Sequence, residues 1–99
     1  MKCDTLVTVE QINGTCPVFQ VGDSFRLLEG YRLSSPKPVC MHALASLMPH
    51  YNALRVSTPD RWGLGPKDGP AYVQCLDPHR HTGGGTVVFA VQQVPTVDG

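Results

Sequence analysis

Short stretches of alternating apolar and polar residues constrain the fold of this chain most. In residues 4–12, DTLVTVEQI, Val7 and Val9 share one face with Thr5, while Asp4 falls on the other. Such alternation is typical of a β-strand with one buried face. Further strands are predicted from three later segments, 24–30, 71–77 and 86–94. The segment 16–19, CPVF, is predicted to be extended as well.

One segment has helical periodicity instead. VCMHALASLM, residues 39–48, places an apolar face at positions i, i+3, i+4 and i+7, formed by Cys40, Ala43, Leu44 and Leu47. Cys40 is therefore expected to face inward, with His42 and Ser46 pointing elsewhere. A helix entrance capped by Ser34 or Ser35 is predicted in SSPKP, since proline is tolerated in a first turn.

These elements predict a single α+β domain over residues 1–99. We expect a small, mostly antiparallel sheet or partly open barrel of four to five strands, covered by one helix. The segments 57–69 and 79–85 are rich in turn-forming residues and are predicted to be loops.

Composition narrows the classes of function. Eight basic and eight acidic residues cancel, and no run of Lys or Arg is present, so no nucleic-acid partner is expected. The longest apolar stretches are far shorter than the ~20 residues of a membrane span. The segment 1–10 has no apolar core of a secretory signal, which predicts a cytoplasmic protein. Thiols usually stay reduced there, so disulfides are the weaker interpretation of the four cysteines.

Three of the cysteines lie at predicted ends of elements. Cys16 precedes a proline, Cys40 lies in the first turns of the helix, and Cys75 ends a strand. Thiolates that converge from such ends suit a soft metal, either zinc or an iron–sulfur cluster. Common short metal and phosphate motifs such as CxxC, HExxH and the P-loop are absent, so this hypothesis depends on convergence in space.

A fourth ligand would come from a histidine. Residues i and i+2 of a helix point about 200° apart, so Cys40 and His42 share a site only if the helix starts between them. His79 and His81 follow Cys75 in a loop and are the other candidates.

Four segments of the chain resemble those of a known family. The strings GTCPVFQVGDSF, VCMHALASLMP, AYVQCLDP and GGTVVFAV are similar to those of a family of uncharacterised bacterial and archaeal proteins of this size. Its members share three cysteines, in Cys-Pro, Cys-x-His-Ala-Leu and Gln-Cys-x-Asp-Pro contexts. The resemblance implies Cys16, Cys40, His42 and Cys75 as marked residues, and it implies no activity. Leu76 replaces the family's usual proline, and the family lacks the 79–81 tract, His-Arg-His.

Three functions remain open. The first is a thiol-rich protein whose cluster or zinc serves a redox, sulfur-handling or regulatory role, with a small-molecule or redox partner. The second is a metal-free binding or assembly module with buried structural cysteines, in which an exposed strand edge offers a route to a homodimer. The third is a thiol catalyst with Cys40 as nucleophile, a histidine as base, and Cys16 or Cys75 as the resolving thiol.

Overall fold

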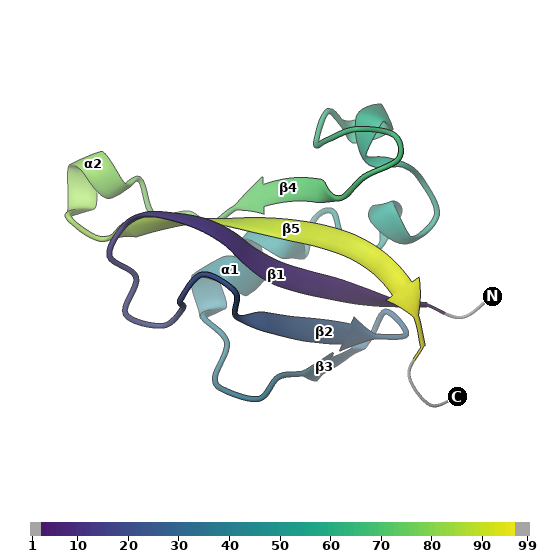
Figure 1. Ribbon diagram of the computed structural model, residues 1–99, viewed down its shortest axis with the longest axis horizontal. Helices are drawn as coiled ribbons and strands as arrows, with labels where there is room; N and C mark the ends of the chain where they lie inside the picture. Colours follow the sequence, from purple (N-terminus) through teal and green to yellow (C-terminus); the bar gives the residue numbers. More distant parts are fainter. Residues whose placement is uncertain (1–2, 97–99) are drawn as a thin grey trace.

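The computed structural model describes residues 3–96 of the chain. In this range five strands form one antiparallel sheet in the order β3-β2-β1-β5-β4 (Figure 1). The strands are β1 (Cys3–Gly14), β2 (Ser24–Leu28), β3 (Arg32–Ser34), β4 (Ala71–Gln74) and β5 (Gly85–Pro95). The helical elements are α1 (Met41–Leu47), α2 (His79–Thr82) and the 3₁₀ turns η1 (Ala53–Arg55) and η2 (Pro59–Trp62).

The first and last strands along the chain form the centre of the sheet. β1 and β5 pair from Cys3 opposite Pro95 to Gly14 opposite Gly85, with an irregularity between Val9 and Gln11. Figure 1 shows the two strands running side by side through the length of the molecule. The remaining strands extend the sheet from this central pair, β2 beside β1 and β4 beside β5.

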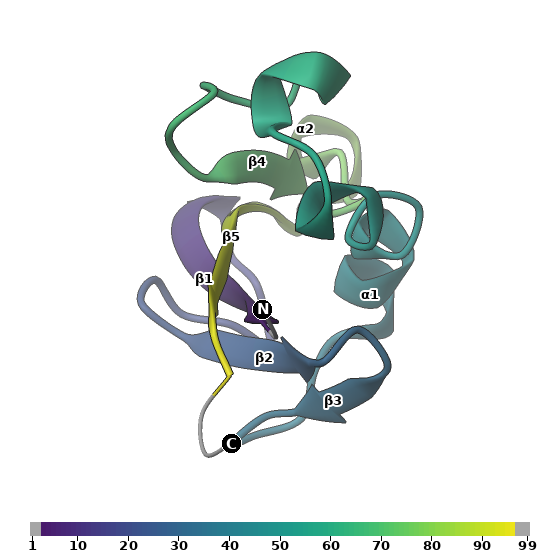
Figure 2. The same ribbon diagram turned by 90° about the vertical axis from the view of Figure 1, so that its right-hand side faces the viewer.

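The core lies on the concave side of the curved, open sheet. The inward residues of the strands, such as Val7, Val9 and Phe89, pack there against Ala43 and Leu47 of α1, as the helical periodicity predicted. Figure 2 shows α1 and the neighbouring turns on this side of the sheet. The predicted antiparallel sheet of four to five strands is thus confirmed as an open sheet of five, and its cover by one helix is weaker than predicted. The helical part is small, because α1 has only seven residues.

Four local predictions were wrong. The segment 16–19 forms no strand. Ser34 ends the edge strand β3, and neither Ser34 nor Ser35 caps a helix, because α1 starts at Met41 with Cys40 as its N-cap residue. The predicted loop 79–85 contains the single turn of α2. Ser46, which was expected to point away from the core face of the helix, is buried, and its hydroxyl is satisfied by the His42 carbonyl at 3.1 Å.

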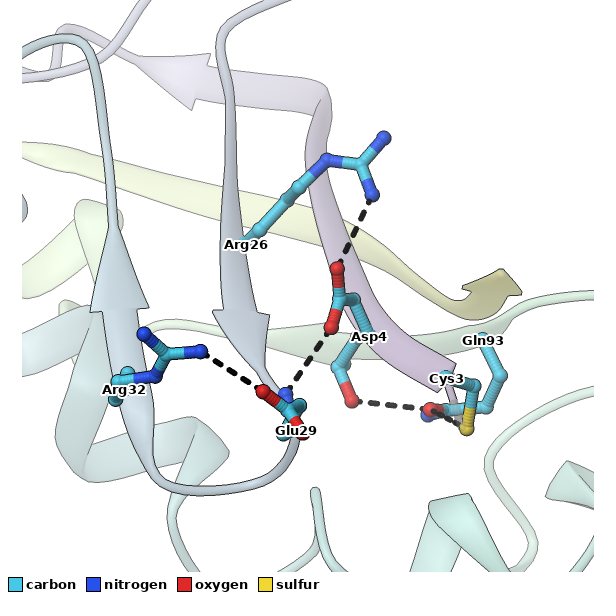
Figure 3. Close-up of polar contacts among 7 residues, drawn as sticks. Cys3, Asp4, Arg26, Glu29, Arg32 and Gln93 are labelled. Atoms are coloured by element: carbon cyan, nitrogen blue, oxygen red, sulfur yellow. Dashed lines mark hydrogen bonds and ion pairs between the residues drawn. The ribbon is translucent and has the colours of Figure 1, made fainter. Parts of the chain in front are cut away.

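Asp4 also differs from its predicted solvent-facing position, since its side chain is completely buried (Figure 3). Its Oδ1 accepts the Glu29 N–H at 3.1 Å, and its Oδ2 lies 3.7 Å from Nη1 of Arg26. Glu29 has a left-handed backbone with φ of 54°, and its carboxylate pairs with Arg32 at 2.8 Å. The buried carboxylate therefore holds the connection between β2 and β3 against β1.

Among residues 3–96, no helix is both long enough and apolar enough to cross a membrane.

Candidate functional site

Three cysteines from distant parts of the sequence line one cavity. Cys16, Cys40 and Cys75 all border a cavity of about 250 Å³ beneath α1. Cys16 comes from the connection between β1 and β2, Cys40 immediately precedes α1, and Cys75 immediately follows β4. His42 and Asp77 complete its polar lining. This is the convergence of elements that the positions of the cysteines predicted.

Cys16 is held in a tight local turn. Its sulfur accepts the backbone N–H groups of Val18 at 3.4 Å and Phe19 at 3.3 Å. These two donors are consequently unavailable for a strand ladder, which is the physical reason that residues 16–19 are not a strand. Two N–H groups directed at one sulfur create a positive environment around it.

Cys75 lines the cavity from the sheet and is hydrogen-bonded to β5. It is 8 % exposed, and its sulfur accepts the Val87 N–H at 3.3 Å. The thiol also lies 3.6 Å from the Gly85 carbonyl, to which it donates. The backbone N–H of Cys75 donates to the Val87 carbonyl at 2.9 Å, so pairing with β5 positions this residue.

The helix begins between Cys40 and His42. Cys40 has an extended backbone, with φ of −65° and ψ of 132°, and the first helical residue is Met41. The opposed directions of an i and i+2 pair inside a helix therefore do not apply. Cys40 is half-buried and His42 is exposed, and both border the same cavity.

The cavity walls between the polar groups are apolar. They are formed by Pro17, Val18, Phe19, Ala43 and Val87. In such surroundings charged sulfur atoms are costly unless a cation or hydrogen-bond donors compensate them.

The cysteines are free, and their present arrangement is not a closed metal site. All four are reduced thiols. Within residues 3–96, no group of three or more His, Cys, Asp or Glu side chains is arranged to hold a metal ion. Cys3 is separate from the other three: its sulfur donates to Oε1 of Gln93 at 3.5 Å at the far end of β1 (Figure 3).

The downstream histidines line a different cavity. His79 and His81 border an open cavity of about 750 Å³ that includes none of the cysteines. Thr86 of β5 lines this second cavity, and its neighbour Val87 lines the cysteine cavity. Because successive residues of a strand point to opposite faces, the two cavities lie on opposite faces of one end of the sheet. His42 is thus the histidine that accompanies the cysteines.

Asp77 is a site residue that the sequence reasoning did not select. It borders the cysteine cavity, and its Oδ1 accepts a hydrogen bond from the Thr82 hydroxyl, which ties it to α2. The signal available in the sequence was its position two residues after Cys75.

An ion pair joins the Cys16 and Cys40 segments. Nζ of Lys37 lies 2.5 Å from Oδ2 of Asp23, and the same oxygen accepts the Gln20 N–H at 2.7 Å. The Lys37 ammonium, followed by the Gln20 N–H, lowers the pKa of Asp23 below its ordinary 3.8. The pair stabilises the folded state above the unfolded-state pKa, and this contribution is lost as the pH falls through the folded-state value.

Replacing Lys37 with Gln tests the ion pair between Lys37 and Asp23. We expect the pKa of Asp23 to rise toward its ordinary value, without reaching it because the Gln20 N–H remains. The difference in stability between the two proteins should be present at neutral pH and vanish in acid. Carboxyl-carbon NMR titration measures the pKa, and an unchanged pKa of Asp23 would show that the ion pair is absent in solution.

Comparisons with protein-family models, with curated proteins and with solved structures found no match to this chain.

Proposed function

We propose that the cysteine cavity binds an iron–sulfur cluster through Cys16, Cys40 and Cys75. The observation that carries this proposal is that three free cysteines from three separate segments border one cavity of about 250 Å³. Thiolates are the ligands that hold iron–sulfur clusters and structural zinc. Zinc is the alternative occupant of the same cavity.

The hydrogen bonds to sulfur support a ligand role. Cys16 accepts two backbone N–H groups and Cys75 accepts one. Hydrogen bonds to the sulfurs and exclusion of solvent are the means by which proteins adjust the potential of a cluster. The apolar walls of Val18, Phe19 and Val87 supply the second of these.

The size of the cavity favours a cluster over a single zinc ion. A zinc ion lies about 2.3 Å from each sulfur, so its ligands must almost touch one another. The cavity of about 250 Å³ is much larger than the roughly 30 Å³ that a water molecule occupies in the liquid. A cluster of several iron and sulfur atoms fills more of this space than a single zinc ion does.

Three cysteines leave one coordination position for another ligand. His42 borders the cavity from the first turn of α1 and is our candidate for it. A position filled by an exchangeable ligand suits a redox, sulfur-handling or regulatory role in a reducing cytoplasm. This role is part of the proposal, and a small-molecule or redox partner would act at the open position.

Anaerobic purification followed by a visible spectrum and assays of iron, zinc and acid-labile sulfide tests the proposal. A brown protein with iron and sulfide supports the cluster. A colourless protein with stoichiometric zinc supports the zinc alternative. A colourless protein that holds neither metal, and takes up neither on reconstitution, overturns metal binding.

Single serine substitutions identify the ligands. We expect Cys16→Ser, Cys40→Ser and Cys75→Ser each to remove most of the bound metal, because two remaining thiolates hold a cluster poorly. Cys3→Ser is the matched control, since Cys3 contacts Gln93 outside the cavity and its loss should leave occupancy unchanged. Equal metal loss in Cys3→Ser would indicate a general loss of stability instead of lost ligands.

A thiol catalyst is a second candidate, favoured by the presence of His42 beside the cysteines in the same cavity. It predicts that one thiol reacts with an alkylating reagent at a pH well below the ordinary thiol pKa of about 8.5. The rate of alkylation as a function of pH measures this in the metal-free protein. An ordinary pH profile for all three thiols would exclude an activated nucleophile.

A further inference from the structure

The larger cavity, on the other face of the sheet, lies outside the proposed metal site. It measures about 750 Å³, within the roughly 300–1,000 Å³ range of small-molecule sites. It is located where the end of β1, the end of β4 and the start of β5 meet α2, at one extremity of the molecule (Figure 1). Its polar lining consists of Asn13, Gln74, Thr86, His79, Arg80 and His81.

The ionisable side chains that line this cavity are all basic. It contains a guanidinium and two imidazoles, and no acidic residue borders the cavity. In the described part of the chain, Arg80 and His81 form no ion pair with a carboxylate. Asp77, the nearest acidic residue in the sequence, borders the cysteine cavity instead and is held by Thr82. The cavity therefore presents uncompensated donors to a ligand.

Hydrogen bonds orient the donors of this cavity. His79 Nδ1 lies 2.9 Å from the Gly84 carbonyl, which can only accept, so Nδ1 carries a hydrogen, and Nε2 donates to an anion when the ring is protonated. The Oδ1 of Asn13 accepts from Nε2 of Gln11 at 3.1 Å, which leaves the Asn13 amino group as a donor. The His79 ring is thus oriented before a ligand arrives.

The backbone of this wall is closely packed. Gly14 has φ of 94°, and a Cβ there would lie 2.3 Å from both His79 Nδ1 and the Gly84 carbonyl oxygen. Only glycine allows the end of β1 to approach the imidazole this closely. The N–H of His79 also donates to the Thr86 hydroxyl at 3.2 Å, and that hydroxyl donates to the Asp77 carbonyl at 2.6 Å. The short helix α2 is therefore fastened to the sheet beneath it.

We propose that this cavity binds a small molecule that carries phosphate or carboxylate groups, through Arg80, His81 and His79. Guanidinium groups recognise such oxyanions with paired hydrogen bonds, and amide and imidazole donors complete their coordination. The site is distinct from the cysteine cavity and is independent of any metal there. The Cys16→Ser protein is accordingly expected to bind the same anions as the unaltered protein.

The test is an NMR titration of ¹⁵N-labelled protein with pyrophosphate, and separately with citrate, at constant ionic strength. We expect saturable shifts confined to residues 79–86 and the end of β1. The anion that binds more tightly distinguishes a phosphate from a carboxylate ligand. Absence of saturable shifts with both anions at millimolar concentration would overturn the proposal.

Two arginine variants separate a site from general attraction. Arg80→Gln should weaken binding by about tenfold or more, because it removes a charge-assisted pair of hydrogen bonds. Arg61→Gln removes the same charge from the exposed surface of η2, away from the cavity lining, and should leave affinity unchanged. Equal weakening in both variants, with both still folded by their NMR spectra, would show that only net charge matters and would overturn the site.

Discussion

Replacing Phe89 with alanine is expected to lower the free energy of unfolding by about 3–5 kcal/mol. Phe89 is 0 % exposed in the central strand β5 and is the largest of the fully buried side chains. The centroid of its ring lies 5.6 Å from that of Phe19 and 6.4 Å from that of Phe25, and both contacts are edge to face. A domain of this size has a total stability of about 5–15 kcal/mol, so the variant loses a large part of it.

Urea denaturation measures the Phe89→Ala effect. Tyr72→Ala is the matched control, because it removes an aromatic ring from the neighbouring strand β4 at a position that is 42 % exposed. We expect Tyr72→Ala to lower the free energy of unfolding by about 1 kcal/mol or less, which is the range for a cross-strand pair. Comparable costs for the two variants would contradict the position of Phe89 at the centre of the core.

Replacing Asp4 with alanine is expected to cost about 2–4 kcal/mol. The variant leaves the Glu29 N–H without its acceptor and removes the partner of Arg26. Asp4→Asn should cost less, because an amide oxygen can still accept from Glu29. The connection between β2 and β3 should loosen in the alanine variant, and faster hydrogen exchange at the Glu29 amide reports this.

Asp68→Ala provides the comparison for Asp4. Asp68 is exposed, and its removal should change stability by about 0.5 kcal/mol or less. An Asp4→Ala protein as stable as Asp68→Ala would mean that the carboxylate is solvated in solution rather than buried.

The strands that were predicted correctly carry a strong local signal. Val7 and Val9 in β1, and Val87 and Phe89 in β5, alternate with less buried residues. A period of two in the sequence indicates this burial on one face. β3 has no such signal because all three of its residues are exposed. It forms because the two-residue turn at Glu29 and Gly30, both with positive φ, returns the chain along β2, so the strand is defined by its partner and not by a pattern of its own.

Asp4 shows the limit of the same pattern. Its place in the alternation assigned it correctly to the face opposite Val7, but that face was taken to be solvated. Its burial depends on Arg26 of β2 and on the N–H of Glu29 in the turn after β2, and neither can be located from β1 alone. Single-strand patterns report which residues share a face and give no information about what covers that face.

For the site, the grouping of Cys16, Cys40 and Cys75 at one cavity could be expected, because each residue borders an end of an element. The position of His79 could not be expected from the sequence. It depends on whether the chain after Cys75 returns over one face of the sheet or the other. The close approach of Gly14 to His79 settles this, and it involves residues far apart in the sequence.

The pairing of β1 with β5 has a consequence for the order of assembly. β1 is made first of the five strands and β5 last, so the centre of the sheet cannot close until synthesis has passed residue 95. Contacts between such distant segments slow folding, because the intervening chain must first be brought into a loop. Val87 of β5 is also part of the cysteine cavity wall, so this cavity is complete only after the last strand has joined the sheet.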